Sequence, residues 1–174
     1  SGCGVQDGSE IHEATLTLLF LNKTGIKTTC FAPNIAQYHT VDHFNGEVQK
    51  NENRRVLEES ARIARGKIED LSKANPEILD GLIFQGGTGA AKNLCDFAYN
   101  AEDCSVNEVV EKIIKTMHAA KKPQGFICIA PVLAARVLGS FNPQLTIGSD
   151  KLTAELLGKM GAEHIVTNVD EIVY

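Results

Sequence analysis

Cys128 is the residue of this chain best placed to do chemistry. It lies in Gln124-Gly-Phe-Ile-Cys-Ile-Ala-Pro131, where an apolar strand-like run ends and a helix-like run begins at Pro131. A cysteine at such a turn places its sulfur at a helix N-terminus, where backbone N–H groups and the helix dipole favour thiolate and lower the thiol pKa. The simpler interpretation is a small buried hydrophobe, because free cysteines in apolar stretches usually are.

The glycine loop Gly86–Gly89 is a second candidate, and it follows the apolar run Gly81–Gln85. Residues 86–93 approach the spacing of a phosphate-binding loop. However, Ala91 replaces its second glycine, and Asn93 replaces the Ser or Thr that would bind magnesium. Glycines after a strand permit a tight turn with positive φ, and they can offer bare backbone N–H groups to a developing oxyanion. We therefore expect an oxyanion-binding turn and no cofactor.

Glu10 and Glu13 are three residues apart at the start of a predicted helix, so they share a face. A glutamate at a helix start is usually a solvated residue that complements the dipole. If Glu13 faces Cys128, however, the carboxyl group would share a proton with the thiol and could act as a general acid and base. The five histidines are scattered, and none is placed locally to serve Cys128.

The segments that must position these residues alternate along the chain between patterns typical of strands and patterns typical of helices. Helices are predicted over Glu10–Lys23 (with Asp7 or Ser9 as its N-cap), Asn53–Arg65, Ala90–Phe97, Asn107–Ala120, Pro131–Leu138 and Thr153–Met160. Strands are predicted over Lys27–Ala32, Ile68–Leu71, Gly81–Gln85, Gln124–Ile129, Leu145–Ile147 and His164–Thr167, with a hairpin over Val41–Gln49. This order indicates an α/β fold, a three-layer α/β/α sandwich with a mostly parallel central sheet. Sites in such sheets form at the carboxyl ends of strands.

Composition narrows the function classes. The 174 residues suit one domain, and the net charge of −5 argues against a nucleic-acid partner. No apolar run approaches the length of a membrane span, so we expect no membrane partner. The five cysteines show no metal-ligand spacing, which predicts no metal site and a reducing compartment, either the cytoplasm or, in a eukaryote, the mitochondrion.

The two ends of the sequence suggest that a longer domain surrounds it. The opening Ser-Gly-Cys-Gly resembles a loop that follows a strand, and Asp170–Tyr174 stops within a strand-like run. We therefore expect residues 1–174 to form a single domain that lacks its first strand and its C-terminal segment.

Three segments together resemble the ElbB family, whose members are named for enhancing lycopene (isoprenoid) biosynthesis. They are Gly4–Glu13, Gly86–Leu94 and Gly125–Pro131, and shorter matches at Arg62–Ile68, Leu145–Gly148 and Met160–His164 extend the resemblance over nearly the whole chain. The family belongs to the ThiJ/PfpI, class I glutamine amidotransferase-like superfamily. The resemblance therefore implies a single class I amidotransferase-like domain with a flavodoxin-like fold.

The resemblance also implies site roles. Cys128 matches the nucleophile-elbow cysteine, Glu13 the glutamate that hydrogen-bonds it, and Gly86, Gly87 and Ile129 the oxyanion hole. The pocket candidates that accompany them on the same side of the fold are Cys3, Asp7, Thr88 and Asn93. No histidine matches the amidotransferase triad, and Gln85 stands where the family usually has proline, so glutamine hydrolysis is not expected.

The activity implied is that of a cofactor-independent glyoxalase, a lyase that converts the small aldehydes glyoxal and methylglyoxal to glycolate and lactate. The resemblance also implies a homodimer. Two alternatives remain open at this point. One is a non-catalytic redox-sensing or protein-interaction module that uses the Cys128 thiolate. The other, which rests on the family name alone, is a structural partner in isoprenoid metabolism.

Overall fold

A computed structural model describes residues 1–174 as an α/β structure built mainly on parallel strand pairs. The parallel pairs are β1 (Cys30–Ala32) with β4 (Ile68–Asp70), β5 (Leu82–Phe84) with β6 (Gln124–Phe126), and β7 (Gln144–Leu145) with β8 (Glu163–His164). The antiparallel pair is β2 (Val41–Asp42) with β3 (Glu47–Val48). The predicted α/β class with mostly parallel pairing is confirmed.

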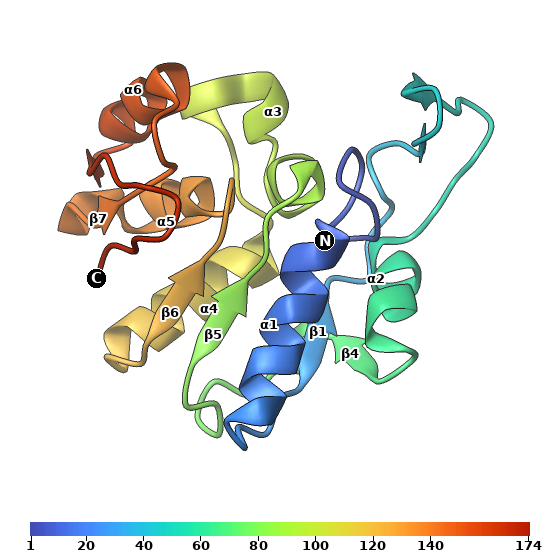
Figure 1. Cartoon of the computed structure of the whole chain (residues 1–174), viewed down its shortest axis with the longest axis horizontal. Helices are drawn as coiled ribbons and strands as arrows, with labels where there is room; N and C mark the ends of the chain where they lie inside the picture. Colours follow the sequence, from blue (N-terminus) through green and yellow to red (C-terminus); the bar gives the residue numbers. More distant parts are fainter.

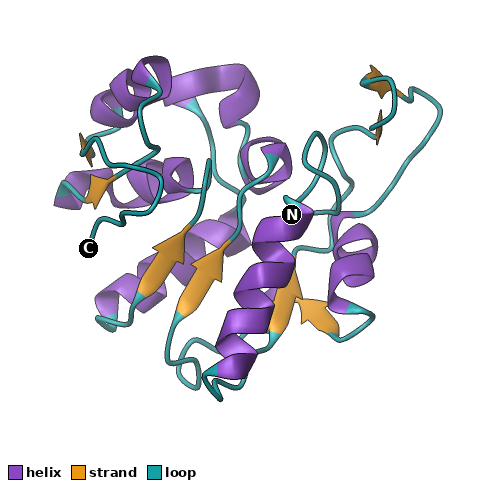
Figure 2. Ribbon diagram, viewed as in Figure 1, coloured by secondary structure: helices purple, strands orange, loops and turns teal.

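Six α-helices connect and cover these strands. They are α1 (Ile11–Lys23), α2 (Val56–Ala64), α3 (Phe97–Asn100), α4 (Glu108–Ala119), α5 (Pro131–Leu138) and α6 (Lys151–Lys159). Short helical turns occupy Leu71–Lys73, Ala90–Leu94, Ala101–Asp103 and Gly139–Phe141. In the view of Figure 1, α1 lies in front, between the β1–β4 and β5–β6 pairs, and α4 lies behind β5 and β6. Helices thus flank the strands on both faces (Figure 2).

The first helix is capped differently from the prediction. Its N-cap is Glu10, whose side chain accepts a hydrogen bond from the backbone N–H of Glu13 at 2.7 Å. Asp7 and Ser9, the predicted caps, are both buried in the preceding loop. Buried polar groups need partners, and Asp7 finds one across the fold because its Oδ2 accepts from the backbone N–H of Val41 at 2.7 Å. This tertiary bond outcompetes local capping.

The main core lies between α4 and α5. The apolar stripe of α4, which is Val110, Ile113, Ile114 and Met117, is buried as its helical spacing predicts. Nearly all of α5 is buried as well, including Pro131, Val132, Leu133, Ala134, Ala135 and Leu138. Because α5 follows Cys128 directly, the core fixes the C-terminal side of the residue most relevant to chemistry.

Several predicted elements end early, among them the strands predicted to reach Ile147 and Thr167, which stop at Leu145 and His164, and two of these endings bear on the site. The strand predicted to reach Ile129 stops at Phe126, because Cys128–Ala130 form the turn into α5. The helix predicted over Ala90–Phe97 ends at Leu94, and Cys95 adopts an extended conformation that pairs with Val106 in an isolated antiparallel bridge.

The hairpin predicted at Asn45-Gly46 is confirmed, and it projects from the body of the molecule (Figure 1). Its base is tied down by the bond between Asp7 and Val41. The side chain of Phe44 near its tip is 99% exposed. No helix of the structure combines the length and the apolar character needed to cross a lipid bilayer.

Candidate functional site

Cys128 occupies a strained elbow between β6 and α5. Its φ angle is +59°, in the left-handed region that residues with a side chain seldom adopt. The turn is held on both sides, because Ile127 N–H donates to Phe84 O at 2.9 Å and Ala130 N–H donates to Ile127 O at 2.9 Å. The segment is therefore a tight turn with a left-handed residue, and it leaves Cys128 exposed.

Glu13 reaches the glycine loop from α1. Its Oε2 accepts a hydrogen bond from the backbone N–H of Gly86 at 2.8 Å, and Glu10 N–H donates to Gly86 O at 3.1 Å. A methyl group placed on Gly86 would lie 2.8 Å from Glu13 Oε2, 2.9 Å from Cys128 Sγ and 2.4 Å from Cys128 Cβ. Glu13 and Cys128 therefore flank the same α-carbon, and only glycine leaves room for both.

Two backbone N–H groups are available beside the sulfur. The amides of Gly87 and Ile129 have no backbone acceptor, and both lower the pKa of the Cys128 thiol. Gly87 has a φ of +85°, and a methyl group there would lie 2.4 Å from both Glu10 N and Gly8 O. The amide of Gly86, also predicted to line an oxyanion hole, is already bonded to Glu13. We therefore assign the donor role to Gly87 and Ile129, and a positioning role to Gly86.

The protonation of Cys128 differs from the sequence-based expectation. Although the residue as a whole is exposed, desolvation of the sulfur by the neighbouring atoms is the largest influence and raises the pKa of the thiol, and the charge of Glu13 raises it further. The N–H groups of Gly87 and Ile129 lower this pKa, but they do not outweigh burial. The predicted lowering by a helix N-terminus is thus wrong, because α5 begins three residues after the sulfur while a carboxyl group stands beside it. At neutral pH the group is mainly a thiol.

The four pocket candidates have different surroundings. Thr88 is exposed on the glycine loop and is anchored there, since its N–H and Oγ1 both lie 2.8 Å from Val5 O. Asn93 is buried, where it donates to Ser1 O and Asp7 O at 3.0 Å and accepts from Tyr38 N–H at 2.9 Å. Asn93 thus joins three loops and is not free to meet a ligand.

Cys3 and Asp7 lie on the N-terminal loop but serve other contacts. Burial raises the pKa of the half-buried Cys3 thiol, while the charge of Arg62 on α2 lowers it. Asp7 is 4% exposed and holds the base of the hairpin through Val41. Of the four candidates, Thr88 alone is exposed at the edge of the site.

All five histidines have partners away from Cys128, as the sequence suggests. His12 bonds Glu10 Oε1 at 2.8 Å, and His39 Nε2 lies 3.2 Å from Lys92 Nζ. The remaining three contact Gln6 and Val41 (His43), the ring of Phe141 (His118) and Ile147 N–H (His164). A histidine base for Cys128 is therefore absent from the structure, which leaves Glu13 as its one ionisable partner.

Sequence reasoning missed two residues that position the site. Glu10 connects α1 to the glycine loop through its N–H and fixes the backbone of Glu13 through its side chain. Lys92 donates to Gln6 O at 2.9 Å and ties the N-terminal loop to the turn after the glycine loop. Glu10 carried a signal, since it lies three residues before Glu13. Nothing in the sequence indicated a positioning role for Lys92, because its acceptor is a backbone oxygen distant in sequence.

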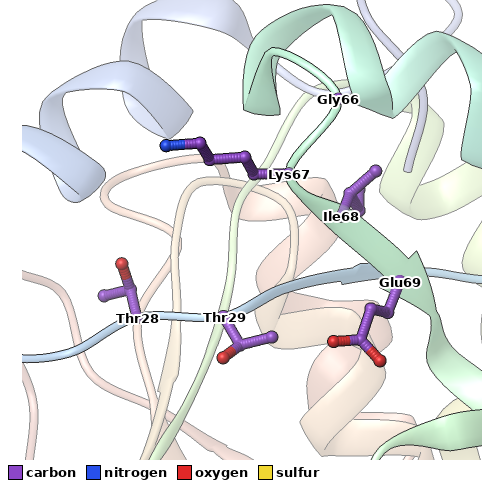
Figure 3. A pocket seen from close by; sticks show the side chains of 6 residues that line it. All are labelled: Thr28, Thr29, Gly66, Lys67, Ile68 and Glu69. Atoms are coloured by element: carbon purple, nitrogen blue, oxygen red, sulfur yellow. The ribbon is translucent and has the colours of Figure 1, made fainter.

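A hollow of about 330 Å³ lies elsewhere, where β1 and β4 begin (Figure 3). It is lined by Thr28, Thr29, Gly66, Lys67, Ile68 and Glu69. This is the amino end of the strands, opposite the carboxyl ends at which α/β proteins place their sites, and no cysteine lines it. No cluster of three or more His, Cys, Asp or Glu side chains in the structure is arranged to hold a metal ion.

Comparison with known proteins gives a consistent result. No model of a protein family matches the chain. The chain is 47% identical over 180 residues to "ES1 protein homolog, mitochondrial" of Rattus norvegicus, covering 98% of this chain and 67% of that protein. It is also 47% identical over 180 residues to "Glutamine amidotransferase-like class 1 domain-containing protein 3, mitochondrial" of Homo sapiens, with 98% and 66% covered. The chain thus spans about two thirds of the length of these curated relatives.

A solved structure supports the same relationship. The crystal structure of an "isoprenoid biosynthesis protein with amidotransferase-like domain" from Ehrlichia chaffeensis superposes with a TM-score of 0.87 at 38% sequence identity. The match covers 95% of this chain and 75% of that one. The predicted flavodoxin-like, amidotransferase-like fold is confirmed by this similarity.

Proposed function

Because this chain belongs to the ElbB/ES1 family of class I glutamine amidotransferase-like proteins, we propose that it is a cofactor-independent glyoxalase. In this proposal it converts methylglyoxal to lactate and glyoxal to glycolate, with water as the only other reactant. The observation that carries the proposal is the placement of Cys128 and Glu13 side by side against Gly86, with no histidine partner for Cys128. A nucleophile paired with a carboxylate suits proton transfer between adjacent carbons.

The first step is addition of the Cys128 sulfur to the aldehyde carbon. Because the pKa of this thiol is raised, its proton must leave as the S–C bond forms, and Glu13 is the adjacent base. The aldehyde oxygen gains the negative charge and lies toward the N–H groups of Gly87 and Ile129. Glu13 then returns the proton to that oxygen, which gives a neutral hemithioacetal.

The second step moves a proton between the two carbons of the substrate. The Glu13 carboxylate removes the hydrogen of the carbon bonded to sulfur, the electron pair forms a C=C double bond, and the π electrons of the neighbouring carbonyl move to its oxygen, which gives an enediolate. Glu13 returns the proton to the neighbouring carbon, the hydroxyl proton of the sulfur-bearing carbon moves to the enediolate oxygen, and the carbon on sulfur becomes a thioester carbonyl. Water then attacks the thioester, which releases the hydroxy acid and regenerates the Cys128 thiol.

The decisive experiment measures lactate formed from methylglyoxal. Wild type is compared with Cys128→Ala and Glu13→Gln, and Cys30→Ala serves as the matched control because Cys30 lies in β1 as a half-buried thiol. The proposal expects loss of turnover in the first two variants and wild-type turnover in the control. Equal rates for wild type and Cys128→Ala would refute it.

The redox-sensing alternative receives less support from the site. A thiol that senses peroxide reacts as thiolate, and the raised pKa of Cys128 keeps the thiolate a minor species at neutral pH. Preferential oxidation of Cys128 over the other four thiols, together with no turnover of either aldehyde, would favour the alternative.

Two further parts of the proposal concern context. The curated relatives are named mitochondrial, which supports action in that compartment. A link to isoprenoid biosynthesis rests on the description of the Ehrlichia chaffeensis protein and the family name.

The homodimer is supported by an exposed apolar face on α1, formed by Leu16, Leu19 and Phe20, which are 50–60% exposed. Sedimentation of wild type against Phe20→Ser tests that assembly.

A further inference from the structure

His43 joins the projecting hairpin to the N-terminal loop, and the chemistry proposed for Cys128 does not use it. It lies in the turn between β2 and β3, and its side chain is 37% exposed. Both ring nitrogens meet the backbone, because Nδ1 lies 3.0 Å from Val41 O and Nε2 lies 3.2 Å from Gln6 N. The ring therefore connects two segments that are 37 residues apart in sequence.

These two contacts fix where the ring of His43 carries its hydrogen. A carbonyl oxygen can only accept, so Nδ1 donates to Val41 O. A backbone N–H can only donate, so Nε2 accepts from Gln6. A ring with one donor and one acceptor is a neutral imidazole. A proton added to Nε2 would occupy the lone pair that holds Gln6 N–H, and that hydrogen bond would be lost.

Asp7 offers the protonated ring another partner. Its Oδ1 lies 3.8 Å from His43 Nε2 and is buried without a hydrogen bond, whereas its Oδ2 accepts from Val41 N–H at 2.7 Å. A methyl group placed on Gly4 would lie 2.6 Å from His43 Nε2 and 3.0 Å from Asp7 Oδ1, so the backbone of Gly4 borders both atoms. A buried carboxylate oxygen without a donor is costly, and an N–H of a protonated imidazole would satisfy it.

We propose that His43 is a pH-dependent switch between the hairpin and the N-terminal loop. In the neutral ring, Nε2 accepts from Gln6 N–H. In the protonated ring, the same nitrogen donates to Asp7 Oδ1 and Gln6 is released. One proton is taken from solvent at Nε2, and no covalent bond breaks. Histidine suits this role, because it is the side chain that ordinarily changes charge between about pH 5 and 8.

The other charged groups of this region do not replace Asp7. The carboxylates of the hairpin, Asp42 and Glu47, are bonded within the hairpin and make no ion pair with the ring. Burial lowers the pKa of Lys92 and of His39, the charge of Lys92 lowers that of His39 further, and the charge of Asp7 opposes both changes. His39 is therefore a second histidine whose charge acts on Asp7, and the experiment includes a variant that removes it.

The switch acts on the segment that holds the glycine loop. Val5 O accepts from the N–H and the Oγ1 of Thr88, both at 2.8 Å, and Gln6 is the next residue along the chain. Release of Gln6 N–H thus frees this segment from the hairpin. Because Thr88 adjoins Gly87, proton uptake by His43 should loosen the edge of the candidate site. The switch itself does not depend on the proposed glyoxalase activity.

An NMR titration of the wild-type protein tests the switch without any substitution. Above the midpoint of the His43 ring signal, the nitrogen shifts should show hydrogen on Nδ1 only, and below it on both nitrogens. The amide proton of Gln6 should move upfield with the same midpoint, because it loses its acceptor. Hydrogen on Nε2 of the neutral ring, or a Gln6 amide that does not follow the ring, would overturn the proposal.

Three variants identify the groups involved. His43→Gln assigns the ring signal by its loss and should remove the pH response of the Gln6 amide, whereas His39→Gln should leave that response in place. Asp7→Asn keeps an oxygen for Val41 N–H but removes the charged acceptor. The Nε2–H proton of the protonated ring should give a separate signal in wild type and lose it in Asp7→Asn. A pH response that disappears with His39, or an Nε2–H signal that persists in Asp7→Asn, would contradict the switch.

Discussion

Glu13 and Cys128 both crowd the space beside the α-carbon of Gly86. Glu13 holds the N–H of Gly86 at 2.8 Å, and the Sγ of Cys128 would lie 2.9 Å from a methyl group placed on the same residue. Their side chains come from helix α1 and from the turn before α5, which are more than a hundred residues apart in sequence.

The substitution Glu13→Gln should change reactivity and turnover in opposite directions. The charge of Glu13 raises the pKa of Cys128, so removing it lowers that pKa and increases the thiolate fraction at neutral pH. Alkylation of Cys128 at pH 7 should then be faster than in wild type, because the thiolate is the reacting form. Methylglyoxal turnover should fall, because the proton carrier is lost. Alkylation that is slower than in wild type would contradict this coupling.

The alkylation rate of wild-type Cys128 should rise with pH through a midpoint above the ordinary thiol value of about 8.5. Burial of the sulfur is the main cause, followed by the charge of Glu13. The measurement follows modification of the tryptic peptide Lys122–Arg136, which contains no other cysteine. A midpoint below 8 would show that the N–H groups of Gly87 and Ile129 dominate instead.

Gly86→Ala should abolish turnover while the protein remains folded. The added methyl group would lie 2.4 Å from Cys128 Cβ, so the elbow or Glu13 must move. We expect at least about a tenfold loss of activity, because misplacement by an ångström can cost a hundredfold. Gly158→Ala in α6 is the matched control, since nothing lies within 4 Å of its methyl position.

The control carries its own expected result. Gly158 is in a helix, where alanine is favoured over glycine by about 0.5–1 kcal/mol. Gly158→Ala should therefore raise the free energy of unfolding, measured by urea denaturation, and leave turnover unchanged. A loss of turnover in both glycine variants would mean that the Gly86 effect is not specific to the site.

Asn107→Ala should destabilise the core helix α4. The Oδ1 of Asn107 accepts from the N–H groups of Val109 and Val110 at 3.1 and 3.4 Å, and losing such an N-cap costs about 1 kcal/mol. Urea denaturation measures the change. Asn22→Ala is the comparison, because the Asn22 side chain is exposed on α1 without a hydrogen bond, and such changes stay within about 0.5 kcal/mol.

Much of the fold follows from local sequence pattern. Helix α5 has the predicted bounds, and the hairpin at Asn45-Gly46 forms as expected, because proline at a helix start and Asn-Gly in a turn act through their own backbone preferences. The elbow at Cys128 was also predictable, since an apolar run meets Pro131 there. These features depend on neighbours in sequence.

The remainder depends on contacts that no local pattern contains. Asp7 fails as an N-cap because Val41, 34 residues away, offers it a buried N–H. The pKa of Cys128 rises because the fold brings Glu13 and Gly86 over the sulfur, whereas the sequence showed only a helix start. The pairing of Glu13 with Cys128 was predicted from the family resemblance. Composition and spacing alone predicted a role for Glu13 only on the condition that it faces Cys128.

The left-handed backbone at Cys128 implies a trade-off between durability and reactivity. A residue with a side chain at φ +59° costs about 1–2 kcal/mol relative to a comfortable conformation, and glycine would remove that cost. Selection for stability alone would therefore favour glycine at position 128, while the same change would delete the sulfur. A random library is screened first for heat resistance and then for alkylation. Cys128→Gly should appear among the clones that are more heat-resistant than wild type and are not alkylated at position 128. Position 128 of this chain therefore holds a cysteine although glycine there would give a higher free energy of unfolding.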